Sequence, residues 1–168
     1  MTKRYEFTGE TKEHCGHTLR RIRAVVSFAS VKKGEVGGWI ETENNLSRYG
    51  NAWVCGDAEV SGNAKVCGNA WVCNDAKVSG NADYAVFKNC WSSMRWFTYT
   101  RSNKMWTVGC FRGTGDELIK KAYADSETSG RCYEAIVRAM ETIEAATAKR
   151  DLIRKHKQQE EVDNDNPF

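Results

Sequence analysis

The sequence predicts an α+β fold that is mainly β: a short hexapeptide-repeat parallel (left-handed) β-helix of about three coils, with N-terminal strands and a C-terminal β-hairpin plus two helices. Two observations lead to this fold class. Residues 50–85 divide into six consecutive hexads, of which five keep Ala at the third place and Val at the fifth. Equivalent side chains also recur every 18 residues, the length of one three-sided coil.

The hexad determines the expected local geometry. Ala and Val two positions apart share one face of a short strand, and the residue between them points to solvent. Gly followed by Asn or Asp suits a sharp bend, because these residue types tolerate positive φ. The predicted inward-facing residues are Ala52, Val54, Ala58, Val60, Ala64, Val66, Ala70, Val72, Ala76 and Val78.

An 18-residue coil aligns complementary side chains on neighbouring rungs. The aligned pairs are Trp53 with Trp71, Cys55 with Cys73, Glu59 with Lys77, and Lys65 with Asp83. Aromatic and opposite-charge neighbours of this kind stabilise adjacent strands. A six- or twelve-residue coil would instead place Lys65 over Lys77, so the pattern favours 18.

The segments before and after the hexads have a different composition. The predicted divisions are an N-terminal strand and cap region at 1–34, the repeat at 35–88, a β-hairpin and helical module at 89–160, and a disordered acidic tail at 161–168. Residues 91–111 read as two strands joined near 102–103, and a capping-box pattern at 114–117 starts the first helix. Helical spacing of apolar residues from 133 to 143 predicts the second helix.

Composition narrows the functional classes. The chain has 168 residues, 40% of them hydrophobic, which fits one domain or two very small ones. No apolar run is long enough to span a membrane, and no signal-peptide pattern follows Met1. The net charge of +3 does not by itself indicate nucleic-acid binding. None of the seven cysteines forms a C-x-x-C pair, so we expect reduced thiols in a cytosolic protein, although cysteines on neighbouring rungs could oxidise.

Residues suited to chemistry are sparse. His14, Cys15 and His17 lie together, but a zinc site needs four clustered ligands, so we expect no metal and no cofactor. The hexads contain no His that could act as a general base, and no phosphate loop or catalytic triad is present. The sequence therefore predicts a protein that is not an enzyme.

Residues 1–145 resemble a family of small proteins of tailed phages and prophages. The matching segments are the lead-in at 34–47, the GNAxV hexads from Gly50, the run at 81–85, and the segment at 109–117. Members of this family combine hexapeptide repeats in a left-handed β-helix with a C-terminal β-hairpin and helix module, and their function is unknown. The resemblance implies a phage-encoded protein of the host-cell cytoplasm.

Phage origin and the absence of a catalytic set lead to a functional hypothesis by analogy. The leading hypothesis is a counter-defence inhibitor that binds and blocks a host protein or protein–nucleic-acid complex such as a CRISPR effector. Its expected route to a homo-oligomer is the β-helix face or the long C-terminal helix. The candidate binding residues are Trp53, Trp71, Glu59, Lys77, Lys65, Asp83, Arg20, Arg21, Arg23, Arg95, Trp96, Tyr99, Arg101 and Trp106. Among them, an outward Trp53–Trp71 ladder is the expected working surface, unless the chain's own C-terminal helix covers it.

Two alternatives stay open. A sponge for a nucleotide signal would use the basic N-terminal arginines or the aromatic hairpin, because basic and aromatic side chains together neutralise phosphates and stack on bases. The less favoured alternative is a hexapeptide-type acyltransferase, which would need a His from a neighbouring subunit. For the arginines and for the aromatics, a purely structural role is the competing interpretation.

Overall fold

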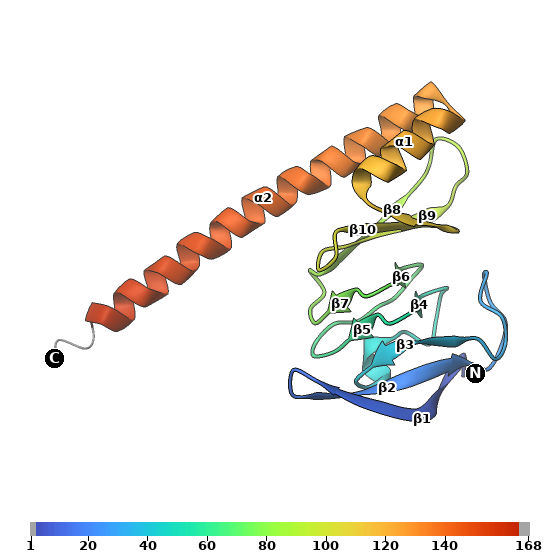
Figure 1. Cartoon of the computed structure of the whole chain (residues 1–168), viewed down its shortest axis with the longest axis horizontal. Helices are drawn as coiled ribbons and strands as arrows, with labels where there is room; N and C mark the ends of the chain where they lie inside the picture. Colours follow the sequence, from blue (N-terminus) through green and yellow to red (C-terminus); the bar gives the residue numbers. More distant parts are fainter. Residues whose placement is uncertain (1–2, 165–168) are drawn as a thin grey trace. The chain divides into compact units, whose positions relative to one another are not determined.

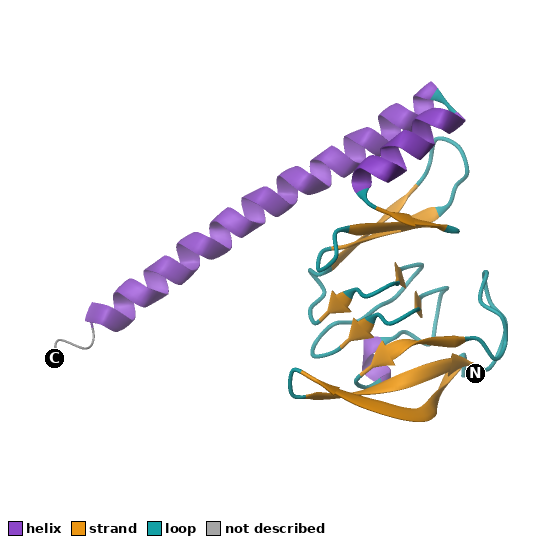
Figure 2. Ribbon diagram, in the orientation of Figure 1, coloured by secondary structure: helices purple, strands orange, loops and turns teal. Residues whose placement is uncertain are grey.

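The computed structural model describes residues 3–164, whose strands form three sheets (Figures 1 and 2). The strands are β1 (Tyr5–His14), β2 (His17–Ala24), β3 (Val36–Ile40), β4 (Trp53–Val54), β5 (Glu59–Val60), β6 (Trp71–Val72), β7 (Lys77–Val78), β8 (Tyr84–Lys88), β9 (Trp96–Thr100), β10 (Met105–Val108) and β11 (Phe111–Gly113). A 3₁₀ turn (Glu43–Asn45) and two α-helices, α1 (Gly115–Asp125) and α2 (Glu127–Asn164), complete the elements. The chain divides into two compact units, Met1–Leu118 and Ile119–Phe168.

The largest sheet is mixed and has the strand order β1-β2-β3-β5-β7. Strands β1, β2 and β3 are antiparallel neighbours, whereas β3, β5 and β7 pair in parallel. A second, two-stranded sheet joins β4 and β6 in parallel. Within the hexads, the 18-residue register is confirmed, because Trp53 pairs with Trp71 and Glu59 pairs with Lys77.

The predicted left-handed parallel β-helix is wrong as a fold class. The structure has short strands in mixed and antiparallel sheets that neither close nor form a solenoid. Strands of the hexads are only two residues long, and the third side of the repeat is reduced to one isolated bridge, between Leu46 and Val66. Strand β3 pairs in parallel with the hexad strand β5 on one side and antiparallel with β2 of the β1–β2 hairpin on the other.

The lead-in segment is also out of the expected register. Ile40 pairs with Val60 and Leu46 with Val66, so the spacing there is 20 residues and not 18. These residues align with the Val places of the hexad, whereas an 18-residue spacing would align them with Ala58 and Ala64. The extra length lies in the turn after Leu46, which precedes Val54 by eight residues, while successive inward Val side chains of the hexads are six apart.

The interior of the repeat is filled as the alternation predicts. All ten inward-facing Ala and Val residues of the hexads are buried, and they form one hydrophobic cluster with Ile22, Ile40 and Leu46. Backbone hydrogen bonds join successive rungs, for example from Trp53 N to Ala70 O at 3.0 Å. The small inward side chains fill the narrow interior of the repeat and exclude water from it.

A four-stranded antiparallel sheet, with the order β11-β10-β9-β8, follows the repeat. Its β9–β10 hairpin turns at residues 101–104, as the sequence predicts. Aromatic rings of three strands pack together, with Phe97 and Trp106 centroids 5.9 Å apart and Tyr99 and Trp106 centroids 4.8 Å apart. Burial of Phe97, Tyr99 and Trp106 in this cluster accounts for part of the aromatic content of residues 91–111.

Hydroxyl groups from the β9–β10 hairpin accept hydrogen bonds from backbone N–H groups in the last rung of the repeat. The Trp71 N–H donates to Thr98 Oγ1 at 3.0 Å, and the Lys77 N–H donates to Ser102 Oγ at 2.7 Å. Asn103 Nδ2 also donates to Asp75 Oδ1 at 3.0 Å, which lowers the pKa of the Asp75 carboxyl. Two of the N–H groups that a further rung would have bound are therefore paired within the chain.

Helix α1 begins where the capping pattern at 114–117 places it, whereas α2 begins at Glu127, earlier than the helical spacing from residue 133 indicates. The predicted capping box is present, because Thr114 N donates to Glu117 Oε2 at 2.8 Å and Glu117 N donates to Thr114 Oγ1 at 3.4 Å. Between α1 and α2, the Tyr123 hydroxyl donates to Glu134 Oε2 at 2.7 Å. Helix α2 extends to Asn164, into the segment predicted to be disordered, and residues 165–168 lie outside the described residues. No helix within residues 3–164 is both long enough and apolar enough to cross a bilayer.

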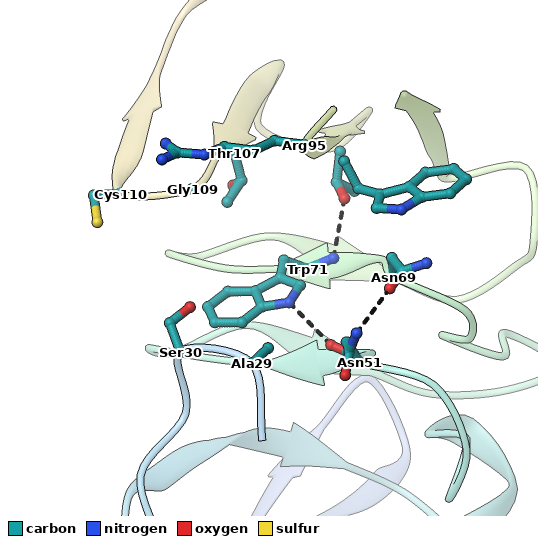
Figure 3. Close-up of a pocket in the computed structure, with 11 residues that line it drawn as sticks. Ala29, Ser30, Asn51, Asn69, Trp71, Arg95, Thr107, Gly109 and Cys110 are labelled. Atoms are coloured by element: carbon teal, nitrogen blue, oxygen red, sulfur yellow. Dashed lines mark hydrogen bonds between the residues drawn. The ribbon is translucent and has the colours of Figure 1, made fainter. Parts of the chain in front are cut away.

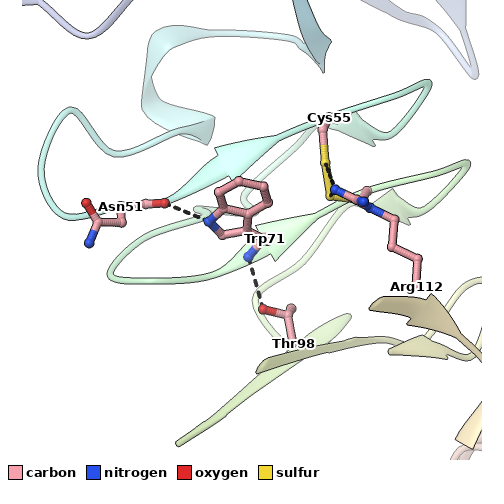
Figure 4. The surroundings of a disulfide bond; sticks show 6 residues. Asn51, Cys55, Trp71, Thr98 and Arg112 are labelled. Carbon is pink, nitrogen blue, oxygen red and sulfur yellow. Dashed lines mark hydrogen bonds between the residues drawn. A yellow bond between two sulfur atoms is a disulfide. The ribbon is translucent and has the colours of Figure 1, made fainter. Parts of the chain in front are cut away.

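Cys55 and Cys73 form a disulfide between two neighbouring rungs (Figure 4). The expectation of reduced thiols is therefore wrong for this pair, which the 18-residue register brings together. The Arg112 guanidinium lies beside both sulfur atoms, 3.9 Å from Cys55 Sγ and 3.8 Å from Cys73 Sγ. Cys67, at the same hexad place on the other side of the repeat, is free and exposed.

Replacing Val66 by Asp is expected to lower the free energy of unfolding by more than about 3 kcal/mol, because it buries an unpaired carboxylate in the repeat. Lys65→Asp is the matched control, since the neighbouring Lys65 side chain is exposed. Urea unfolding followed by circular dichroism measures both variants. Equal stability of the two variants would contradict the inward placement of Val66.

Cys73→Ser is expected to destabilise the oxidised protein by about 3 kcal/mol, because the bridge closes a loop of 18 residues in the unfolded chain. The same loss should follow when the wild type is reduced with dithiothreitol. Cys67→Ser is the control and should leave the urea midpoint unchanged. A wild-type midpoint that does not respond to reductant would show that the bridge does not form.

Candidate ligand-binding pocket

A pocket of about 420 Å³ lies between the repeat and the four-stranded sheet, within residues 1–118 (Figure 3). The lining residues are Ala29 and Ser30 from the loop before β3, Asn51, Asn69 and Trp71 from the repeat, and Arg95, Trp96, Thr98, Thr107, Gly109 and Cys110 from the sheet and its turns. Figure 3 shows Trp71 between a floor that contains Asn51 and an opposite wall that contains Arg95 and Thr107. The volume falls in the range of small-molecule sites in proteins.

Two hydrogen bonds fix Trp71 at the floor of the pocket. Its indole Nε1 donates to the Asn51 backbone carbonyl on the rung below at 3.0 Å, and its backbone N–H donates to Thr98 Oγ1. Figure 4 shows both bonds and the rung of Cys55 beside them. The ring is half-buried, so a ligand would find it already oriented, and little conformational entropy would be lost on binding.

Asn51 and Asn69 form a short ladder on successive rungs beside Trp71. Asn51 Nδ2 donates to Asn69 Oδ1 at 3.1 Å. This bond uses one donor of Asn51 and the acceptor of Asn69, which leaves the Oδ1 acceptor of Asn51 and the Nδ2 donors of Asn69 for a ligand. The ladder therefore offers a donor and an acceptor side by side at the edge of the pocket.

Arg95 supplies the positive charge of the pocket. Its side chain runs along the wall toward Gly109 and Cys110 (Figure 3). A Cβ atom on Gly109 would lie 3.3 Å from Arg95 Nη1, and Gly109 has a φ of +58°, so a glycine at this turn leaves room for the guanidinium. Among the described residues that line the pocket, Arg95 is the only ionised side chain at neutral pH.

Three of the residues predicted for binding meet in this pocket: Trp71, Arg95 and Trp96. Trp96 has 44% of its surface exposed, and Lys88 Nζ lies 5.7 Å from its ring centroid. The predicted outward ladder of Trp53 on Trp71 is wrong as a binding surface, because Trp53 is completely buried. Phe28 packs edge-on against the Trp53 ring at 5.6 Å, so the loop before β3 covers this side of the repeat.

The basic residues of the N-terminal hairpin lie on the mixed sheet and line no part of the pocket. Arg20 stacks on Phe7, Arg21 stacks on Trp39 at 4.9 Å, and Arg23 pairs with Glu6. These contacts agree with a structural role for the three arginines, the alternative to anion binding. Arginine on an aromatic face or beside a carboxylate contributes to packing and solubility without needing a ligand.

The charged pairs expected along the repeat are only partly formed. Glu59 and Lys77 are register partners, but Glu59 Oε1 binds Lys12 Nζ at 2.7 Å, while Lys77 Nζ lies 3.1 Å from His14 Nε2. The prediction that Lys65 pairs with Asp83 is wrong. The Asp83 carboxylate accepts hydrogen bonds from the backbone N–H groups at positions 79 and 80, and so closes a turn.

The remaining candidates belong to the four-stranded sheet. Tyr99 and Trp106 are buried in its aromatic cluster and are not available to a partner. The Arg101 backbone N–H donates to the Asp83 carbonyl at 2.9 Å, which ties the hairpin to the end of the repeat. For the aromatics, the structural interpretation is therefore correct for Tyr99 and Trp106 but not for Trp96.

His14 and His17 each lie beside a glutamate carboxylate of the chain. His17 Nδ1 lies 2.9 Å from Glu41 Oε1, and this contact, with a second bond from the Gly62 N–H, lowers the pKa of the Glu41 carboxyl. His14 Nε2 lies 3.6 Å from Glu59 Oε2. No group of three or more His, Cys, Asp or Glu residues within the part of the chain that the structure describes is arranged to hold a metal ion.

Several lining residues carry no recognisable sequence signal. Asn51 and Asn69 occupy hexad corners, where turn formation is sufficient to explain them. Ser30, Thr98 and Thr107 reach the pocket only because the loop before β3 and the β9–β10 hairpin meet the repeat, a long-range contact that no local pattern encodes. No protein-family model and no curated protein sequence matches this chain, so its function has to be inferred from this geometry.

Thr98→Val is expected to destabilise the protein by about 1–3 kcal/mol, because it leaves the Trp71 N–H without its acceptor. Thr107, the register partner of Thr98 on β10, is the matched control: its hydroxyl makes none of the hydrogen bonds found among the described residues. Thr107→Val should therefore change the urea midpoint much less. An equal effect of the two variants would contradict the role of Thr98 in fixing Trp71.

Proposed function

We propose that the protein is a non-enzymatic binding protein that captures a small molecule in the pocket formed by Trp71, Arg95 and Trp96. The pocket itself carries this proposal. It is preformed, it joins residues from three separate segments of the chain, and it combines aromatic surface with a few polar groups. Sites of this composition are typical of ligand binding.

The chemistry of the lining favours capture over turnover. The described lining residues include no His, Asp, Glu or Lys that could move a proton at neutral pH. Ser30 and Cys110 are nucleophile types, but neither has a general base beside it in the lining set. A protein that holds its ligand without converting it acts stoichiometrically, which suits sequestration.

The resemblance to phage and prophage proteins supports a counter-defence role in the host-cell cytoplasm. In this role, the protein withdraws a small molecule that the host uses as a signal. Sequestration replaces the direct block of a host protein as the leading hypothesis, because Trp53, one half of the Trp53–Trp71 surface that the block was expected to use, is completely buried.

Blocking a host protein or protein–nucleic-acid complex is the second candidate function. Met94 and Trp96 favour it, with 57% and 44% of their surfaces exposed next to Arg95. Exposed Trp, Met and Arg side chains are enriched at the centres of protein interfaces. A partner docked there would cover the mouth of the same pocket, so the two functions can be separated by what occupies the site.

Purified full-length protein from infected cells should carry a bound small molecule at near-stoichiometric yield. Native mass spectrometry of the intact protein measures the added mass, and denaturation should release it. Trp96→Ala should lose most of this ligand, since stacking on an exposed ring contributes about 1–3 kcal/mol. Tyr49→Ala is the matched control, because Tyr49 is an exposed aromatic residue, at 65%, that does not line the pocket.

Two results would overturn capture of a small molecule. One is a wild-type protein whose intact mass equals that of the bare chain. The other is a host protein bound at equal yield by the wild type and lost in Trp96→Ala, which would establish the second candidate in its place.

A further inference from the structure

We infer that the pocket is specific for a phosphate-bearing ring compound of the nucleotide class, with Arg95 binding the phosphate and Trp71 and Trp96 contacting the base. This inference rests on the proposed function and adds the chemical class of the ligand. Three properties of the pocket carry it: its charge, its flat aromatic surfaces, and its hydrogen-bonding edge.

The charge of the lining selects an anion. Arg95 is the ionised group, and the described lining contains no carboxylate that would neutralise it or attract a cation. A guanidinium presents a planar fork of N–H donors that matches two phosphate oxygens. The space that Gly109 leaves beside Arg95 Nη1 allows the guanidinium to lie along the wall of the cavity.

The two tryptophans select a flat ring. Trp71 is held by its bonds to the Asn51 carbonyl and to Thr98, while Trp96 is open to solvent at the rim. Indole faces stack on any of the nucleobases, because every base has a π-face. A simple inorganic anion would use Arg95 but would leave this aromatic surface without a contact.

The Asn51–Asn69 ladder adds the third property. After their mutual bond, the two amides still offer one acceptor and further donors at the pocket. Nucleobase edges carry adjacent donors and acceptors, so the ladder can bind such an edge while the ring contacts tryptophan. An aliphatic or purely hydrocarbon ligand would make no hydrogen bonds with these amides.

The test is isothermal titration calorimetry of the full chain with AMP, ATP, adenosine and inorganic phosphate. AMP or ATP should bind with a 1:1 stoichiometry, while adenosine and inorganic phosphate, each lacking one half of the ligand, should bind at least about tenfold more weakly. Arg95→Met should weaken AMP binding by about tenfold or more and leave adenosine binding unchanged.

Arg20→Met is the matched control and should bind AMP as the wild type does, because Arg20 stacks on Phe7 outside the pocket. A larger loss in Arg20→Met than in Arg95→Met would overturn the assignment of the phosphate to this pocket. Circular dichroism of each variant verifies that it is folded.

The outcomes separate this inference from the function on which it rests. If the intact protein carries a small molecule that lacks phosphate, and neither AMP nor ATP binds, capture holds and the nucleotide class is wrong. If the protein carries no small molecule and binds none of the four probes, the proposed function fails as well. Equal affinity for phosphate and AMP would show that the ring makes no contribution, and would overturn the nucleotide class in favour of a simple phosphate site.

Discussion

Stacking of identical backbone edges at 18-residue intervals is the constraint on which the rest of the structure depends. Each rung donates to the rung 18 residues later, as Trp53 N does to Ala70 O and Glu59 N does to Ala76 O. The inward Ala and Val side chains are small, so they fill the narrow interior of the stack at normal packing density. The same spacing aligns outward groups, and so produces the Asn51–Asn69 ladder and the Cys55–Cys73 bridge. The floor of the pocket is therefore a direct product of the repeat.

The register within the hexads could be predicted from sequence because it depends on a local period. The identity of the buried residues followed from the same alternation, and the helix start at Thr114 followed from its capping pattern. The β-helix class failed because a period states how rungs align but not how far each strand extends. With strands of two residues, pairing partners outside the repeat decide the sheets, and the β1–β2 hairpin converts one side into a mixed sheet.

The site was harder to predict because its walls come from distant parts of the chain. Trp71 and Trp53 occupy the same hexad place, yet only Trp71 lines the pocket, since Phe28 and its loop cover Trp53. Arg95 and Trp96 were candidates among many basic and aromatic residues, and composition alone could not separate them from the buried Tyr99 and Trp106. The distinction depends on which side of β9 meets the repeat, and that is fixed by contacts such as Thr98 with Trp71.

The hydroxyl groups of Thr98 and Ser102 have a consequence for how the chain can change length. They bind the N–H groups of Trp71 and Lys77, positions that recur in every rung, so they recognise the edge of the stack and not one particular rung. Duplication of one 18-residue unit would present the same edge to the same two hydroxyls. The β9–β10 hairpin could therefore cover the last rung of a longer repeat in the same way. Gene duplication could lengthen the repeat without exposing these two N–H groups to the strands of other chains.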